Sequence, residues 1–176
     1  MDRTEIDGLL RLIAMGDNAA FEKLYAQTRR GVYAFLYTYF HNAADTEDAL
    51  QSVYLKIKMN IVGYRAGTNA RAWILQIAKN HALNELRRRK VETISNEMVA
   101  ANAVDVLQDI ENSSGITEVM QKVLSEDEQR IVTLHVLWDY KHREIAKMLD
   151  SPLGTVLSKY KRAIEKMRKA LKEVEA

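Results

Sequence analysis

The chain contains no cysteine and a single proline in 176 residues. Without cysteine, disulfides and zinc sites built on thiolates are excluded, and we expect a protein of the reducing cytoplasm. Proline and glycine are scarce while Ala, Leu, Glu, Lys and Arg are abundant, which is typical of an all-α protein. No apolar run is long enough to cross a bilayer, and charged residues interrupt the amino-terminal stretch. We therefore expect neither a signal segment nor membrane insertion.

A strong excess of charge of one sign is also absent, because the net charge is only +2. The distribution of charge is uneven. Residues 1–90 contain 14 Lys/Arg and 9 Asp/Glu, residues 91–115 contain no Lys/Arg and 5 Asp/Glu, and residues 116–176 contain 12 and 10. Two basic blocks on either side of an acidic one indicate two modules and a linker. We predict an all-α chain with two small helical domains, 1–90 and 116–176, joined by an acidic linker over 91–115.

The stretch from His142 to Arg168 has the pattern of two helices joined by a tight turn. Its first half has apolar residues at the spacing of one helix face, and Asp150-Ser151-Pro152 then interrupts the pattern. We expect Ser151 to cap the second helix and Pro152 to lie in its first turn. This is the pattern of a helix-turn-helix, whose second helix fits the major groove of DNA.

The second helix of this motif has an apolar stripe that begins at Val156 and an opposite face that is polar and basic. The polar face carries Thr155, Ser158, Lys159, Lys161, Arg162, Lys166 and Arg168. Lys and Arg on such a helix neutralise phosphates, and side chains early in it reach base edges. A helical hairpin with a solvated basic face has the same pattern, because the motif also occurs in proteins that do not bind DNA.

The amino-terminal block reads as four helices, over residues 4–15, 18–40, about 45–61 and 70–90. We expect Asp17, Asp45 and Asn69 to cap the last three of them. The aromatic residues between Tyr33 and Phe40 could stack on bases, but packing between helices explains their density more simply. In the carboxy-terminal block, Ser125 followed by Glu128 predicts a capping box, and the helix after it should bury residues as far as Leu137.

The helix expected after Asn42 begins with Asp45-Thr46-Glu47-Asp48 and continues with Gln51. Acidic residues in a first turn complement the helix dipole, so this cluster can be ordinary capping. The same cluster can also be a docking face for a basic or helical protein partner. Composition does not choose between these two interpretations.

The helix over residues 70–90 follows a polar, glycine-containing loop and ends in Arg87-Arg88-Arg89-Lys90. Its polar face also carries Lys79, Asn80 and Asn84. Asn and Arg on one helix face beside such a loop are typical of a nucleic-acid surface. A solvated helix end complementing the dipole is the alternative, but four consecutive cations exceed what capping needs. We therefore favour contact with a polyanion.

The segments together resemble a known family. In chain order they are DALQSVYLKI, YRAGTNARAWILQIAKNHALNELRRRK, an acidic spacer, LSEDEQRIVTLHVLWDYKHREIAKML and SPLGTVLSKYKRA. This order, over nearly the whole chain, closely resembles the extracytoplasmic-function (group IV) sigma factors of bacterial RNA polymerase, within the sigma-70 family. The resemblance implies that residues 1–90 are sigma domain 2 and residues 116–176 are sigma domain 4. The acidic linker would then follow the polymerase channel near the RNA path.

The resemblance also implies three sets of site residues. Those that bind the polymerase core are Asp45, Glu47, Asp48, Leu50, Gln51 and Tyr54. Those that bind the melted −10 element are Tyr64, Arg65, Gly67, Thr68, Asn69, Lys79, Asn80, Asn84, Arg87 and Arg88. Those that read the duplex −35 element are Thr155, Val156, Ser158, Lys159, Lys161 and Arg162. A flipped base of the non-template strand would enter a pocket formed by Gly67, Thr68, Asn69 and Asn80.

The partners implied are the core polymerase, through its β′ clamp and β flap, promoter DNA, and an anti-sigma factor. No cofactor and no metal are expected. Three positions depart from the family pattern. Leu157 stands where many relatives carry a cation, Lys141 replaces a Ser/Thr-type cap, and Ser52 replaces an acidic residue after Gln51.

Two other classes of function remain as alternatives. A stand-alone helix-turn-helix regulator would bind DNA without polymerase, but it does not explain the second basic helix or the acidic helix start. An enzyme could use His81 with Glu85, or His41 with nearby acids, as metal ligands. The sequence contains no nucleophile motif, phosphate loop or HExxH. We therefore predict no catalytic site.

Overall fold

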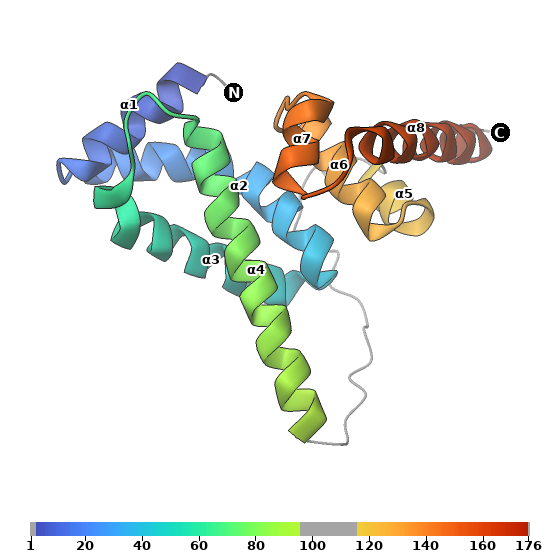
Figure 1. The fold of residues 1–176 in the computed structure, drawn as a ribbon, viewed down its shortest axis with the longest axis horizontal. Coiled ribbons are helices and arrows are strands. Elements are labelled where there is room, and N and C mark those ends of the chain that lie inside the picture. The colour runs from blue at the N-terminus through green and yellow to red at the C-terminus, as the bar shows by residue number, and fades with distance from the viewer. Residues whose placement is uncertain (1–2, 96–115, 176) are drawn as a thin grey trace. The chain divides into compact units, whose positions relative to one another are not determined.

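The computed structural model describes residues 3–95 and 116–175, and every regular element within these ranges is helical (Figure 1). The elements are α1 (Arg3–Ala14), α2 (Asn18–Phe40), α3 (Ala43–Asn60), the 3₁₀ helix η1 (Ile61–Gly63), α4 (Ala70–Ser95), α5 (Ile116–Val123), α6 (Glu126–Val136), α7 (His142–Met148) and α8 (Leu153–Glu175). The all-α prediction is confirmed. None of the described helices is both long and apolar enough to cross a membrane.

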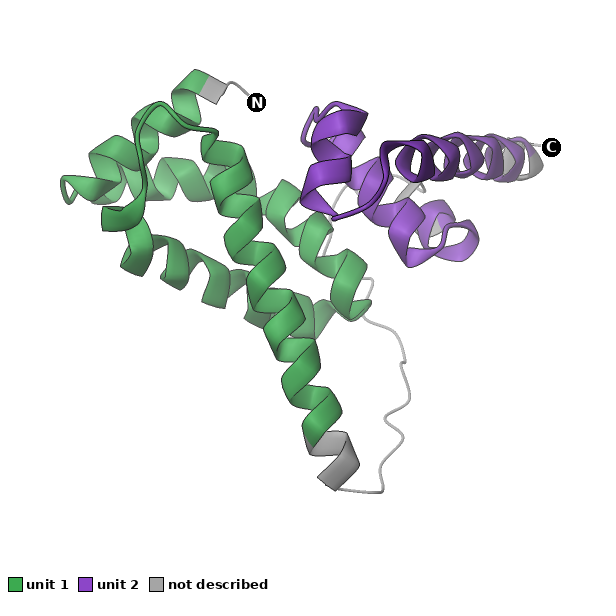
Figure 2. Cartoon of the chain, viewed as in Figure 1, with its two compact units in different colours: residues 1–106 green, residues 107–176 purple. Residues whose placement is uncertain are grey.

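The chain divides into two compact units, residues 1–106 and residues 107–176 (Figure 2). We call them unit 1 and unit 2. Helix α4 continues to Ser95, five residues beyond its predicted end, so the first residues of the expected linker are helical. The rest of that linker, residues 96–115, lies outside the described residues, and the borders proposed for it stay a prediction.

Unit 1 has one core between α1, α2, α3 and α4. Its fully buried side chains include Ile6, Leu10, Leu24, Val32, Phe35, Leu36, Leu50, Val53, Ile57, Ile74 and Leu75. Of the aromatic residues in α2, Phe35 and Tyr39 are buried in this core, and their rings pack edge to face at 5.4 Å. These two side chains are therefore core residues, as the packing interpretation predicted.

The predicted caps in unit 1 are confirmed with one exception. The side chain of Asp17 accepts a hydrogen bond from the Ala20 N–H at 3.0 Å and caps α2, which ends at His41 in the left-handed conformation. Helix α3 begins two residues earlier than predicted, because Asn42 caps it by accepting from the Asp45 N–H at 3.0 Å. The assignment of Asp45 as the cap is wrong. Its carboxylate belongs to the first turn and is left to bind elsewhere.

Unit 2 packs α5, α6 and α7 against α8 around a smaller core. The predicted capping box is confirmed, since Ser125 Oγ accepts from the Glu128 N–H and the Glu128 carboxylate accepts from the Ser125 N–H. The prediction that α6 buries residues as far as Leu137 is wrong. Val136 and Leu137 are 61% and 43% exposed, and Trp138 takes the core position beyond the helix end.

The turn between α7 and α8 contains Asp150 in the left-handed conformation, and the Ser151 N–H bonds the Ala146 carbonyl at 2.9 Å. Helix α8 starts at Leu153, and the Pro152 carbonyl accepts from the Val156 N–H at 3.1 Å. Pro152 therefore takes the cap position that was predicted for Ser151. The two helices and this tight turn form the expected helix-turn-helix.

Candidate nucleic-acid and protein interfaces

The acidic start of α3 is only partly a surface. Glu47, Asp48 and Gln51 are exposed, whereas Leu50 is 1% and Tyr54 4% exposed. The Tyr54 hydroxyl lies 2.5 Å from the Thr28 hydroxyl inside the core of unit 1. Leu50 and Tyr54 therefore hold α3 against α2, and in this conformation their side chains cannot contact a partner. This corrects their inclusion among the polymerase-binding residues.

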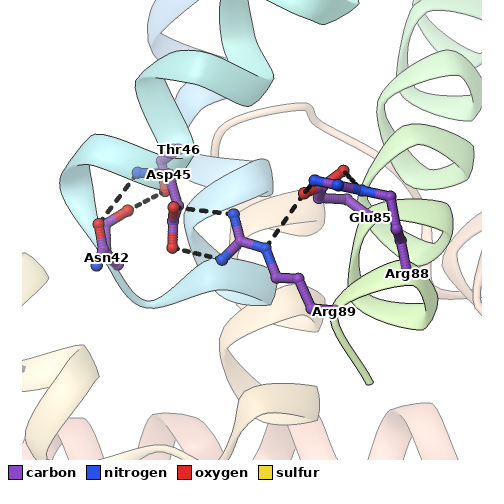
Figure 3. A network of polar contacts seen from close by, with 6 residues as sticks. All are labelled: Asn42, Asp45, Thr46, Glu85, Arg88 and Arg89. Atoms are coloured by element: carbon purple, nitrogen blue, oxygen red, sulfur yellow. Dashed lines mark hydrogen bonds and ion pairs between the residues drawn. The ribbon is translucent and has the colours of Figure 1, made fainter. Parts of the chain in front are cut away.

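Asp45, also in that set, is engaged within unit 1 (Figure 3). Arg89 near the end of α4 donates to both its carboxylate oxygens, at 2.6 and 2.9 Å, and a third hydrogen bond of 3.2 Å joins Arg89 Nε to Glu85. Arg88 donates to Glu85 at 2.7 and 3.3 Å. The guanidinium of Arg89 also lies over the Phe40 ring, 5.5 Å from its centroid. This ion-pair network ties the start of α3 to the end of α4.

The network lowers the pKa of both carboxylates. Hydrogen bonds from Arg88, with further contributions from Arg89, lower the pKa of Glu85 to about 2, and the Arg89 hydrogen bonds lower the pKa of Asp45. Two of the four consecutive cations at positions 87–90 are therefore paired with acids of unit 1. Arg88 stays 62% exposed at its side chain and can still face a polyanion.

The loop between η1 and α4 is anchored by a residue that sequence reasoning missed. Asp7 of α1 is only 9% exposed, and it accepts hydrogen bonds from the Tyr64 hydroxyl at 2.5 Å and the Gly67 N–H at 2.8 Å. Gly67 adopts φ +80, which a glycine tolerates without strain. The Tyr64 hydrogen bond lowers the pKa of Asp7, with Arg11 also 2.7 Å away. The sequence did contain one signal of this role, because Asp7 is an acidic residue next to the buried apolar stripe of α1.

The other loop residues divide between support and surface. Asn69 uses its side-chain oxygen to cap α4, accepting from the Ala72 N–H at 3.1 Å, as predicted. The Thr68 hydroxyl donates to the Arg65 carbonyl at 2.7 Å. Arg65, Gly67 and Thr68 are exposed, while Tyr64 is half-buried and packs against the Trp73 ring at 5.1 Å. The loop is thus fixed by its contacts with Asp7 and Trp73, and its tip is exposed to solvent.

Four predicted residues of α4 form an exposed face of this helix. Asn80, Asn84, Arg87 and Arg88 are exposed, and their spacing puts them on one helix face. Asn80 accepts a hydrogen bond from Gln76 at 2.8 Å. Lys79 is half-buried on a neighbouring face. Most of the residues predicted to bind melted DNA are therefore exposed, at the tip of the loop or on this face of α4, and their contact with DNA stays a prediction.

Helix α8 also divides its predicted residues between faces. Ser158, Lys161 and Arg162 are exposed, Thr155 is half-buried, and Val156 is fully buried. Val156 is therefore a core anchor, which corrects its place in the DNA-reading set. Lys159 forms an ion pair with Asp127 in the first turn of α6, and this pair lowers the pKa of Asp127.

The histidines considered as metal ligands have other neighbours. His81 Nδ1 lies 2.9 Å from Lys56 Nζ, and burial together with this lysine lowers the His81 pKa. Glu85 is bound by two arginines. Within the part of the chain that the structure describes, no group of three or more His, Cys, Asp or Glu could hold a metal ion.

Comparisons with known proteins match two separate regions of the chain. Residues 24–92 match sigma-70 region 2, and residues 120–167 match sigma-70 region 4. An ECF RNA polymerase sigma factor SigK of Mycolicibacterium vanbaalenii is 28% identical, with 95% of this chain and 89% of the relative covered. The RNA polymerase sigma-H factor of Pseudomonas aeruginosa is 25% identical over 93% of this chain and 92% of the relative.

Two solved structures have a similar fold. The sigma factor RpoE of Bartonella quintana, crystallised with the anti-sigma factor NepR, superposes with a TM-score of 0.68 at 19% identity, over 86% of this chain and 96% of that chain. CnrH, in complex with the cytosolic domain of CnrY, gives 0.62 at 17% identity, over 99% and 100%. The two matched regions, together with the ECF relative that covers nearly the whole chain, show that the chain belongs to the extracytoplasmic-function group of the sigma-70 family.

Proposed function

We propose that this protein is a sigma factor that binds core RNA polymerase and directs it to promoters for transcription initiation. The observation that carries the proposal is the occurrence of region 2 and region 4 in one chain, each with an exposed basic or amide-rich helix face. The family points to a role without catalysis, so RNA synthesis belongs to the polymerase. The domain borders 1–90 and 116–176 and a cytoplasmic location are parts of the same proposal.

Unit 1 docks on the β′ clamp through the exposed acidic face of α3. We restrict this face to Glu47, Asp48 and Gln51, because the side chains of Leu50 and Tyr54 are buried. Asp45 supports the face indirectly, since it fixes the first turn of α3 to Arg89. Ser52, which stands where relatives carry an acidic residue, is half-buried beside this face. The missing negative charge is therefore at the edge of the acidic face and not at its centre.

Unit 1 also binds the melted −10 strand. The tip of the loop, Arg65, Gly67 and Thr68, and the α4 face of Asn80, Asn84, Arg87 and Arg88 are the surface that supports this role. Amide groups can hydrogen-bond an unstacked base, while the arginines bind the backbone. Unpairing a base costs a few kcal/mol. Polymerase offsets that cost because it holds both DNA-binding units near the promoter, which raises their effective concentration.

Unit 2 reads the duplex −35 element through the exposed face of α8. Ser158, Lys161 and Arg162 lie on one side of this helix, which follows the tight turn as a recognition helix does. An anti-sigma factor and the β flap are the further partners that the family suggests. The two structural neighbours named above are themselves complexes with NepR and CnrY, which supports including a partner of this class.

The test is run-off transcription with bacterial core polymerase on pooled genomic promoters, with and without the protein. We expect defined transcripts that require the protein and that are lost in the variant Asp48→Arg/Gln51→Ala. Glu22→Arg, which reverses an exposed acid on α2, is the matched control and should keep full activity. The transcripts also give the promoter elements.

Other results would contradict the proposal in different ways. No stimulation of polymerase, with duplex DNA still bound by the protein alone, would indicate a stand-alone helix-turn-helix regulator. Neither stimulation nor DNA binding would show that the motif is only a scaffold in this chain. Equal losses in the Glu22→Arg control would show that general charge, not the α3 face, controls polymerase binding.

A further inference from the structure

The first turns of α8 present one continuous exposed face. Its exposed residues are Gly154, Leu157, Ser158, Lys161 and Arg162, which follow the spacing of a single helix side. Four of these five residues are the small, polar or basic types expected on a DNA-facing helix. Leu157 is the exception, and its side chain is 46% exposed.

A single exposed leucine on a protein surface needs no explanation. This one differs because of its position. It is the fifth residue of α8, in the part of a recognition helix that reaches base edges, and Lys161 and Arg162 lie about one turn further along the same face. An apolar side chain between a glycine and two cations is therefore placed where a base pair would meet it.

The two polar residues that follow Leu157 in the chain are engaged within the protein. The Ser158 hydroxyl donates to the Thr155 carbonyl at 3.0 Å, and the Lys159 amino group pairs with Asp127. Gly154, one turn earlier, is surrounded by open space, since a Cβ added there would meet nothing within 4 Å. A base edge can therefore approach Leu157 closely over the low surface of Gly154.

Among the groups in the major groove, thymine alone offers an apolar one, its C5 methyl. We propose that Leu157 is a specificity-determining residue that contacts the C5 methyl of a thymine in the duplex promoter element. The inference rests on the proposed function of unit 2. A cation at this position would favour guanine, whose O6 and N7 accept hydrogen bonds. Leu157 therefore gives this chain a preference for thymine at one position of its −35 element.

The test removes the methyl group alone. Holoenzyme is assembled from core polymerase and the full chain on a promoter recovered from the run-off assay, and each upstream thymine is replaced singly by deoxyuridine. One replacement should weaken binding by about two- to fourfold, the range for burying about one methyl group. Leu157→Ala should weaken binding of the thymine promoter to a similar extent, and deoxyuridine should then have no further effect.

Two more variants sharpen the result. Val136→Ala removes another exposed apolar side chain of unit 2, 61% exposed, and should keep the full deoxyuridine effect. Leu157→Lys should change the preferred base at the affected position from thymine to guanine. A deoxyuridine effect of unchanged size in Leu157→Ala would overturn the methyl contact.

The remaining outcomes separate this inference from the function on which it rests. If Arg162→Ala weakens promoter binding but no upstream deoxyuridine does, the DNA role of α8 stands and the thymine contact fails. If Leu157→Ala weakens polymerase binding in the absence of DNA, the side chain contacts protein and the thymine contact is overturned. If neither Arg162→Ala nor any change in the upstream duplex affects binding, the DNA-reading role of unit 2 fails and the inference fails with it.

Discussion

In each unit, a cation of a long basic helix pairs with an acid in the first turn of another helix, but the cation differs between the units. In unit 1, Asp45 at the start of α3 holds Arg89 of α4. In unit 2, Asp127 at the start of α6 holds Lys159 of α8. The guanidinium makes two hydrogen bonds to one carboxylate, whereas the lysine provides a single amino group on a flexible stem.

The difference suggests different uses for the two pairs. The Arg89 pair lies at the end of α4, its side chains 41% and 30% exposed, and it fixes where that end lies against α3. Lys159 lies in the second turn of α8, and its acid is 52% exposed. A lysine can leave such an exposed acid for a phosphate at little cost. We therefore expect the first pair to be structural and the second to be exchangeable.

The largest expected effect concerns the cores rather than the pairs. Trp138→Ala removes a fully buried side chain from the smaller unit and should destabilise it by about 3–5 kcal/mol. A small helical domain has little more stability than this, so unit 2 should unfold while unit 1 stays folded. The chain has one tryptophan in each unit, so Trp73 fluorescence during urea denaturation reports unit 1 in this variant.

The control is Trp73→Phe, in which Trp138 reports unit 2. If the Trp73 transition of Trp138→Ala moves to a lower urea concentration together with the unfolding of unit 2, the two units do not unfold separately.

The second prediction compares two cations of the same helix. Arg162→Ala should weaken holoenzyme binding to the −35 duplex by about 1–3 kcal/mol if it contacts a base, or reduce the slope of log affinity against log salt by about 1 if it contacts phosphate. Lys159→Ala should have a smaller effect, because its amino group gives up Asp127 to bind DNA. Titration of promoter fragments over a range of salt concentrations measures both. Equal effects would mean that Asp127 does not compete with DNA.

The third prediction concerns the ion pair of unit 1. A double-mutant cycle with Asp45→Asn and Arg89→Met should give a coupling energy of about 1 kcal/mol, at the upper end for a partly exposed pair because it is bidentate. Urea denaturation followed by Trp73 fluorescence measures it. A coupling near zero would show that Arg89 is held by the Phe40 ring rather than by Asp45.

The same network makes the stability of unit 1 depend on pH in the acid range. The pKa of Glu85 falls from its ordinary 4.5 to about 2, so its contribution is full above pH 4.5 and is lost as the pH falls towards 2. Glu85→Gln should be less stable than the wild type at pH 7 by about 0.5–1 kcal/mol, since two helical pairs contribute about 0.3–0.5 each. The difference should vanish near pH 2. A difference that stays constant with pH would attribute it to packing.

The smallest effect is expected for the pair of unit 2. A cycle with Asp127→Asn and Lys159→Met should give about 0.3–0.5 kcal/mol and should decrease with added salt, because Asp127 is half-exposed. Far-ultraviolet circular dichroism during urea denaturation follows it. A coupling larger than that of Asp45 and Arg89 would reverse the distinction between a structural pair and an exchangeable one.

Features that depend on near neighbours in the chain were predictable from the sequence. The caps at Asp17 and Asn69 and the capping box from Ser125 to Glu128 each involve residues three apart, so spacing reveals them. The helix-turn-helix was visible for the same reason. Asn42 was missed as a cap because Asp45 has the same capping ability, and composition could not rank the two.

Contacts between distant residues could not be predicted in this way. Arg89 and Asp45 are 44 residues apart, and Gly67 and Asp7 are 60 apart. The resemblance named Val156, Leu50 and Tyr54 as site residues, yet all three are buried, because a motif marks characteristic positions without saying which face they occupy. The full burial of Trp138 likewise depends on how the unit 2 helices pack.

The hydrogen bonds from Tyr64 and Gly67 to Asp7 mean that the loop between η1 and α4 is completed by α1. Closing so long a segment has an entropic cost that only the packed helices between can offset. The shape of the loop therefore depends on the packing of α1 as well as on the hydrogen bonds among its own residues. Because α1 also contributes Ile6 and Leu10 to the core, a fusion or truncation that displaces α1 would alter the loop from sixty residues away and would weaken the core of unit 1 as well.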